Sequence, residues 1–184
     1  MILNIITSNV GKYKEYSEIL DKYNIATNFI KQEYIEIQAN TIEEVVELAL
    51  ISLSEKYNYF MIDDSGLFID CLSGFPGVYS SYVFKTLGNE KILNLMENEV
   101  NRNAYFKTVI GLSINRKFYY FTGVCKGAIA MAQKGKNGFG YDPIFIPANE
   151  NRTFSEFEIN EKNKISHRGL AALSLIDFLN KKVL

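Results

Sequence analysis

The first forty residues alternate short apolar runs with a helical pattern. Residues 2–7 are predicted to form a buried strand that ends in a polar turn closed by Gly11, and a helix is expected from about residue 12. A short strand at 26–30 and a further segment at 34–37 follow. The predicted apolar face of the helix comprises Tyr16, Ile19, Leu20 and Tyr23.

A capping box predicts the next helix. Thr41 is followed three residues later by Glu44, the pairing that satisfies amide groups at a helix start. Residues 59–62 are then an apolar strand, which is expected to end in the acidic turn 63–66 before the chain returns as a strand at 67–72. The predicted inner face of the capped helix comprises Ile42, Val45, Val46, Ala49 and Leu53.

Glycine and proline divide the remaining helical patterns. Residues 74–77 have the composition of a turn, and helical patterns cover 79–87 and 90–97. A glycine-rich loop is expected at 133–141, and a last helix is expected from about 162 to 180.

Two long strand-like runs, 104–114 and 118–126, are predicted to form a hairpin around Asn115-Arg116, with 127–132 as an extension of the same sheet. Strands and helices therefore intermingle without strict βαβ alternation. This pattern favours an α/β (α+β-like) fold with a mixed sheet and a cleft, rather than a doubly wound parallel sheet. The length of 184 residues favours one domain with two lobes over two independent units.

Charge and composition narrow the class of ligand. The chain has 20 basic and 21 acidic residues, so it lacks the basic excess typical of nucleic-acid-binding proteins. A few chosen cations would still suffice for a small anionic ligand. No apolar run approaches the length that spans a membrane, and residues 1–6 are too short for a signal peptide, so we expect a cytoplasmic protein with no membrane partner.

The cysteines and the single histidine argue against a soft metal. Cys71 and Cys125 fit no zinc-binding spacing, and His167 is the only histidine. Any metal is therefore expected to be a hard cation held by carboxylates. Two familiar nucleotide motifs are also excluded, because neither Gly11-Lys12 nor Gly135-Lys136 completes a Walker loop and Pro143 breaks a dinucleotide fingerprint.

Segment 7–12 lies between a predicted strand and a predicted helix. Amide groups at a helix start, together with Ser8, Asn9 and Lys12, are a plausible cradle for a polyphosphate. An ordinary N-capped turn is the alternative, and the segment alone does not decide between the two.

Segment 63–66 places two carboxylates after an apolar strand. Adjacent acids repel each other unless a cation relieves them, and Glu36 on the earlier segment is a third candidate oxygen ligand. Carboxylates without histidine or cysteine indicate Mg²⁺, which also binds substrate phosphates. A solvated acidic turn is the alternative.

Segments 138–143 and 161–168 complete the candidate chemistry. Phe139 lies between two glycines and is suited to stack on a base. The alternative is a flexible loop in which Phe139 folds into the core of the protein. Three side chains with hydrogen-bond donors lie close together in the second segment: Lys162, His167 and Arg168. They suit an anionic or carbonyl-bearing ligand, and the alternative is a solvated helix start.

With these four segments, the chain resembles the inosine triphosphate pyrophosphatase family, whose members act on dITP, ITP and XTP. The resemblance runs from Thr7 to Arg168, with the motifs in the family's order. The matching residues are Thr7, Asn9, Lys12 and Glu15; then Asp63, Asp64, Ser65 and Gly66; then Phe139, Gly140, Tyr141, Asp142 and Pro143; and finally Glu161, Lys162, Ser166, His167 and Arg168.

The resemblance implies a fold, an assembly and a reaction. The fold is an elongated mixed β-sheet flanked by helices, forming a single domain over 1–184 with two lobes around a central cleft. The assembly is a homodimer, for which the turn 74–79 and the helix after it are the interface candidates. The reaction is hydrolysis of a purine nucleoside triphosphate to the monophosphate and pyrophosphate. Alternatives are a pyrophosphatase for modified pyrimidines and a non-catalytic nucleotide-binding module.

The resemblance also assigns roles to residues. Asp64 is the expected catalytic base, and Glu36 and Asp64 are the expected Mg²⁺ ligands. Many members carry a Lys at the position of Leu48, so Lys12 is expected to carry a larger share of the phosphate contacts here. The expected substrate-binding residues are Thr7, Ser8, Asn9, Val10, Gly11, Lys12, Ser65, Phe139, Gly140, Tyr141, Asp142, Lys162, His167 and Arg168.

Overall fold

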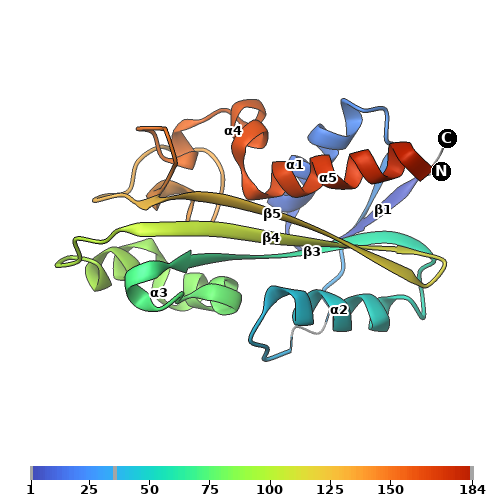
Figure 1. Cartoon of the computed structure of the whole chain (residues 1–184), viewed down its shortest axis with the longest axis horizontal. Coiled ribbons are helices and arrows are strands. Elements are labelled where there is room, and N and C mark those ends of the chain that lie inside the picture. The colour runs from blue at the N-terminus through green and yellow to red at the C-terminus, as the bar shows by residue number, and fades with distance from the viewer. Residues whose placement is uncertain (1, 35–36, 183–184) are drawn as a thin grey trace. The chain divides into compact units, whose positions relative to one another are not determined.

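A computed structural model describes residues 2–34 and 37–182 of the chain, and these residues form a mixed six-stranded sheet with helices (Figure 1). The strand order is β2-β1-β3-β4-β5-β6. β1 pairs in parallel with both β2 and β3, whereas β6 pairs antiparallel with β5, which confirms the predicted mixed α/β class. The strands are β1 Leu3–Ile6, β2 Thr27–Ile30, β3 Tyr59–Ile69, β4 Asn103–Ile114, β5 Lys117–Ile129 and β6 Phe145–Pro147.

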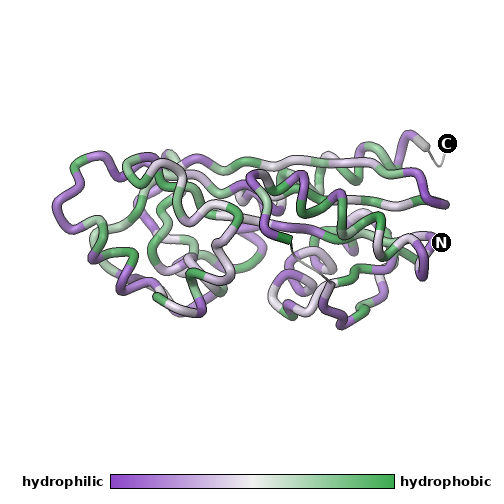
Figure 2. Tube along the Cα trace, turned by 90° about the horizontal axis from the view of Figure 1, so that it is seen from below, coloured by the Kyte–Doolittle hydropathy of each residue, from purple (hydrophilic) through white to green (hydrophobic). Residues whose placement is uncertain are grey.

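The helices alternate hydrophobic and hydrophilic residues along their turns, as Figure 2 shows by colour. This is the pattern of helices that bury one face. No helix in the described part of the chain is both long and apolar enough to cross a membrane. The α-helices are α1 Val10–Asp21, α2 Ile42–Leu53, α3 Ser80–Leu95, α4 Ile159–Ile165 and α5 His167–Lys182.

The chain divides into two compact units. The first comprises Met1–Asp64, Thr108–Gly123 and Arg168–Leu184, and the second comprises Ser65–Lys107 and Val124–His167. Strands β3, β4 and β5 each contribute residues to both units. The central cleft implied by the resemblance stays a prediction.

The first unit is built on apolar residues from β1, α1 and α5. Its buried cluster includes Leu3, Tyr16, Ile110 and Leu175. Helix α1 begins at Val10, two residues earlier than expected, because Asn9 caps it. Tyr23, which was predicted to belong to the buried face, is 45% exposed because the helix ends at Asp21.

Helix α2 confirms the capping-box prediction. Thr41 accepts from the amide of Glu44, whose side chain in turn accepts from the amide of Thr41. All five predicted inner residues are buried. The glycine at 111 allows α2 to approach β4, since a Cβ there would lie 2.6 Å from Cγ1 of Val46 and 2.7 Å from Cδ1 of Leu50.

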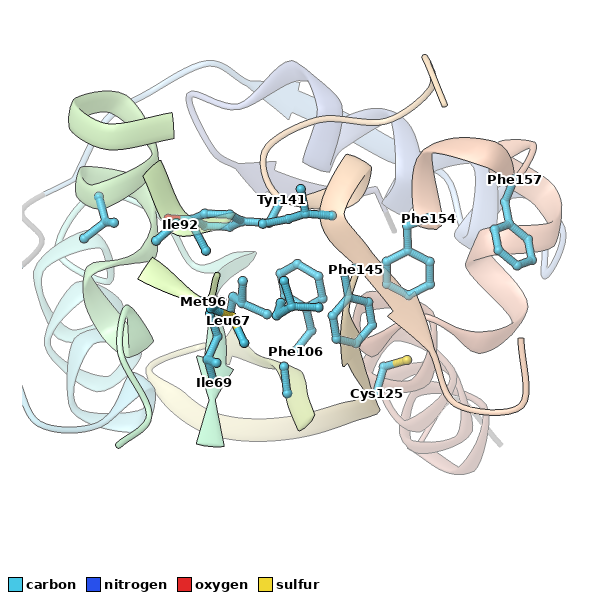
Figure 3. Packing of buried hydrophobic residues seen from close by; sticks show 14 residues of the cluster. Leu67, Ile69, Ile92, Met96, Phe106, Cys125, Tyr141, Phe145, Phe154 and Phe157 are labelled. Carbon is cyan, nitrogen blue, oxygen red and sulfur yellow. The ribbon is translucent and has the colours of Figure 1, made fainter. Parts of the chain in front are cut away.

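The second unit has an aromatic core, drawn in Figure 3. The ring of Phe106 lies 4.7 Å from that of Phe145 and 6.1 Å from that of Phe154, measured between ring centroids. Strand β6, which carries Phe145, was not predicted because it is only three residues long.

The predicted acidic turn at 63–66 is wrong, because β3 continues through it without a break. Gly66 is a turn signal in the sequence, but the fold requires a glycine here for a different reason. A Cβ at this position would lie 2.4 Å from the carbonyl oxygen of Gly77, so the glycine permits a close backbone approach inside the second unit. The strand predicted at 67–72 ends at Ile69, and Asp70–Leu72 form a 3-10 turn.

Of the helical predictions after residue 78, the first two are confirmed and the last is wrong. The patterns at 79–87 and 90–97 are confirmed as the two arms of α3, which bends at Gly88 with φ 68°. The single last helix is wrong, since Ser166 has extended backbone and separates α4 from α5. The hairpin is confirmed, with Asn115 and Arg116 both at positive φ as a two-residue turn requires.

Candidate functional site

The start of α1 is organised by its own cap. The side-chain oxygen of Asn9 accepts from the amides of Gly11 at 2.9 Å and Lys12 at 3.2 Å, and Oγ1 of buried Thr7 accepts from the amide of Asn9 at 3.1 Å. Ser8 and Val10 are exposed. Two of the amides that the sequence offered to a phosphate are therefore engaged by Asn9, so the N-capped turn is confirmed and the phosphate cradle stays a prediction.

Asp63 is a buried carboxylate with a cationic partner. Nζ of Lys12 lies 3.1 Å from its Oδ2 and donates to its carbonyl oxygen, also at 3.1 Å. The hydroxyl of Tyr34 donates to the same carbonyl at 2.9 Å. Because Asp63 is only 2% exposed, it is a fixed, neutralised group and not part of a solvated acidic turn.

Asp64 differs from its neighbour in its surroundings. Consecutive residues of a strand point to opposite faces, so the two carboxylates diverge, and Asp64 is half-buried. This leaves Asp64 with the access to water that a reactive carboxylate needs. Glu36, the other expected metal ligand, lies outside the described residues. Within residues 2–34 and 37–182, no three or more His, Cys, Asp or Glu side chains gather into a group that could hold a metal ion.

Arg168 forms a buried ion pair that the sequence did not reveal. Its Nε donates to Oε2 of Glu15, and their side chains are 3% and 4% exposed. Burial lowers the pKa of Arg168, but the negative charges of Glu15 and Asp63 outweigh this and raise it above its ordinary value. The guanidinium is therefore permanently charged. The signal for this pair was a glutamate next to Tyr16, on the buried side of α1.

Tyr16 shares this environment. Its side chain is fully buried, and burial, followed by the negative charge of Asp63, raises the pKa of its hydroxyl well above the ordinary value. It therefore stays neutral at physiological pH. Helix α1 thus presents a cation, an anion and a neutral phenol to the interior of the first unit.

In the second unit, Asp142 organises the glycine-rich loop. Its Oδ2 accepts from the amide of Phe139 at 2.9 Å and from Nζ of Lys162 at 2.6 Å. Gly138 has φ +74°, and a Cβ there would lie 2.1 Å from this oxygen. Only glycine therefore lets the loop close around the carboxylate.

The ring of Phe139 is half-buried and lies outside the aromatic core, so the prediction of a core position does not hold. Nζ of Lys162 lies 5.2 Å from its centroid, within the range of a cation–π contact. Ser65 is half-buried in the same unit.

Gly140 and Tyr141 are held by residues of α3. The carbonyl of Gly140 accepts from Nδ2 of Asn89 at 3.0 Å, a contact that no sequence signal indicated. The hydroxyl of Tyr141 donates to the carbonyl of Ser80 at 2.9 Å, and its side chain is buried. The Tyr141 side chain is therefore a structural anchor, and only its backbone suits a ligand.

His167 is buried and packs on aromatic rings. Its ring stacks on that of Phe106 at 4.4 Å with an interplanar angle of 12°, and it is 1% exposed. Ser166 before it is fully buried. A solvated helix start, the alternative for this segment, is therefore wrong.

The chain is similar to known proteins over most of its length. The model of the Ham1 family matches residues 3–178. A Pyrococcus horikoshii protein named dITP/XTP pyrophosphatase is 50% identical over 97% of each chain, and a Thermococcus kodakarensis protein of the same name is 44% identical over the full length of both. A solved HAM1 protein from Coxiella burnetii is similar with a TM-score of 0.82 and 32% identity, covering 97% of this chain and 99% of its own.

Breaking the Glu15–Arg168 pair should be costly. Glu15→Leu leaves a buried guanidinium without its partner and should lower the free energy of unfolding by about 3–5 kcal/mol in urea titrations. The double variant Glu15→Leu/Arg168→Met should recover at least half of this loss, because both buried charges are gone. The control is Glu150→Leu, which breaks a surface contact to Arg152 at 3.8 Å and should cost less than about 1 kcal/mol. A double variant as unstable as the single one contradicts the interpretation.

Proposed function

The chain belongs to the Ham1 family, and we propose that it hydrolyses non-standard purine nucleoside triphosphates, namely dITP, ITP and XTP, to the monophosphate and pyrophosphate. The observation that carries the proposal is the half-buried Asp64, which follows a buried, cation-paired Asp63 on β3. Its support comes from the two relatives named dITP/XTP pyrophosphatase, which match this chain over nearly its whole length.

Asp64 acts as the general base. It takes a proton from a water molecule, whose oxygen forms a bond to the α-phosphorus while the bond from that phosphorus to the bridging oxygen breaks. Pyrophosphate leaves with the electron pair of that bond. Since Lys12 is paired with Asp63, Asp64 is spared the full repulsion of an adjacent charge.

The triphosphate contacts residues at the start of α1. Ser8, the Asn9 amide and the Val10–Lys12 backbone are the candidates, with Ser65 in addition. Lys12 is already bonded to Asp63, so binding a polyanion exchanges one charged partner for another. Leu48 is 46% exposed on α2 and offers no cation there, which leaves Lys12 with a larger share of the binding.

Mg²⁺ fits the chemistry of the donors that the chain offers. Asp64 supplies a hard carboxylate oxygen, and the resemblance assigns Glu36 as its companion. When bound, the cation would supply neutralisation of charge on the phosphate oxygens.

The base stacks on Phe139. This ring is half-buried, Nζ of Lys162 on α4 lies 5.2 Å from its centroid, and the 140–142 backbone follows it in the same loop. His167 and Arg168 are both buried and already in contact with other side chains, so we assign them an indirect role in base recognition. Hypoxanthine and xanthine present a carbonyl acceptor at position 6, which suits the donors of this set, whereas adenine presents an amino donor there.

We also propose a cytoplasmic homodimer. The turn before α3 and the first turns of that helix expose three aromatic rings, Phe75 at 37%, Tyr79 at 45% and Tyr82 at 69%. Buried between two copies, these rings would cover apolar surface that is otherwise in water.

A substrate profile tests the function. The protein is incubated with Mg²⁺ and each triphosphate, and orthophosphate is measured with and without added inorganic pyrophosphatase. We expect signal with dITP, ITP and XTP only when pyrophosphatase is added, and far less with ATP. Turnover of modified pyrimidine triphosphates alone would support the first alternative. Binding without turnover would instead support a nucleotide-binding module.

Asp64→Asn keeps the shape of the side chain but removes the base and a charge. We expect kcat for dITP to fall at least about 100-fold, in the range that a general base contributes. The circular dichroism spectrum and the unfolding midpoint should stay close to those of the parent. Asp70→Asn, an exposed carboxylate after β3, is the control and should leave kcat unchanged. Hydrolysis by Asp64→Asn at the parental rate would refute the assignment.

Phe139→Leu tests base stacking. Removing the aromatic face should raise KM for dITP about tenfold or more, since stacking contributes about 1–3 kcal/mol per base. The matched control is Phe118→Leu, a half-buried ring on β5, which should leave KM within about twofold of the parent because the substitution conserves apolar character. Equal KM values for the two variants would show that the base is recognised elsewhere.

A further inference from the structure

The carbonyl of Asp63 lies beyond the end of the neighbouring strand. β1 ends at Ile6, and its pairing with β3 reaches Met61, two residues before Asp63. A backbone carbonyl in a largely buried strand still needs donors, because an unsatisfied polar group costs free energy. Side chains therefore have to replace the missing strand on this side.

Two side chains supply those donors. The hydroxyl of Tyr34 donates at 2.9 Å and Nζ of Lys12 at 3.1 Å. Lys12 divides its charge between this carbonyl and the Asp63 carboxylate. Tyr34 has no charge to divide, and its bond is the shorter of the two.

We propose that Tyr34 is a positioning residue for Asp64. The carbonyl that it binds belongs to the peptide group joining Asp63 to Asp64, so the hydroxyl fixes the plane from which the Asp64 side chain departs. This inference rests on the proposed role of Asp64 as the base.

The effect is greatest when substrate is bound. If Lys12 turns from Asp63 to the triphosphate, the carbonyl loses the donor that Lys12 supplies, while the hydrogen bond from Tyr34 still holds the peptide. Tyr34 therefore acts on the chemical step, whereas its hydroxyl has little reason to change the affinity for the triphosphate.

Tyr57 offers a matched control in the same unit. Its hydroxyl also makes one hydrogen bond of 2.9 Å, to Oε1 of Gln32, and its ring is also half-buried. Removing either hydroxyl deletes one comparable bond. Of these two tyrosines, Tyr34 is the one whose hydroxyl bonds the peptide that precedes Asp64.

The experiment compares Tyr34→Phe with Tyr57→Phe in steady-state hydrolysis of dITP with saturating Mg²⁺. We expect Tyr34→Phe to lower kcat about tenfold, the loss of one hydrogen bond at the upper end of its usual strength, with KM within about twofold of the parent. Tyr57→Phe should change neither value by more than about twofold.

Thermal unfolding of both variants shows whether stability explains the result. Each should lose a similar, small amount of stability, and the assay is run well below the lower midpoint. Equal kcat values for the two variants, or a loss in Tyr34→Phe that appears only in KM, would overturn the proposal. If the parent itself fails to hydrolyse every triphosphate, the proposed function fails instead, so the two failures are distinguishable.

Discussion

The first unit depends on one constraint: a charge removed from water must have a partner. Asp63, Glu15 and Arg168 are all nearly inaccessible. Helix α1 resolves this with residues three positions apart, which lie on the same side of a helix. Lys12 binds Asp63 of β3, and Glu15 binds Arg168 at the start of α5. A single helix therefore ties a strand and a second helix together through charge, in addition to apolar packing.

This constraint explains why the element pattern was readable while the site geometry was not. Apolar periodicity predicted α1, α2, the arms of α3 and the long hairpin, because each element buries one face. It misread β3, since polar residues and Gly66 are turn signals in isolation. The reason for Gly66 is the backbone of Gly77, eleven positions later, and periodicity carries no information about such a contact.

The candidate site was predicted as a set of residue types, but not as a set of existing bonds. Sequence reasoning named Lys12, Arg168 and Lys162 as donors for a ligand. In the structure each of them already has a carboxylate partner. Pairings such as Arg168 with Glu15 join residues 153 positions apart, beyond any local pattern. In the proposed site, binding is thus an exchange of partners, which only a ligand of high negative charge can make favourable for Lys12. A nucleoside without phosphates offers no such exchange.

In the second unit, the same kind of pairing supports the selectivity for the base that we propose. Asp142 is fixed by the amide of Phe139 and by the tight fit against Gly138. Lys162, bound to Asp142, therefore stays near the Phe139 ring without further ordering. For a base stacked on that ring, a donor that is already in place can form a hydrogen bond to a carbonyl acceptor without further rearrangement. With adenine, the same donor faces an amino group that is also a donor. The mismatch costs about 1–3 kcal/mol for each group left unpaired. Because the donor cannot relax away from Asp142 without breaking a buried ion pair, the mismatch is not relieved by a change of side-chain conformation.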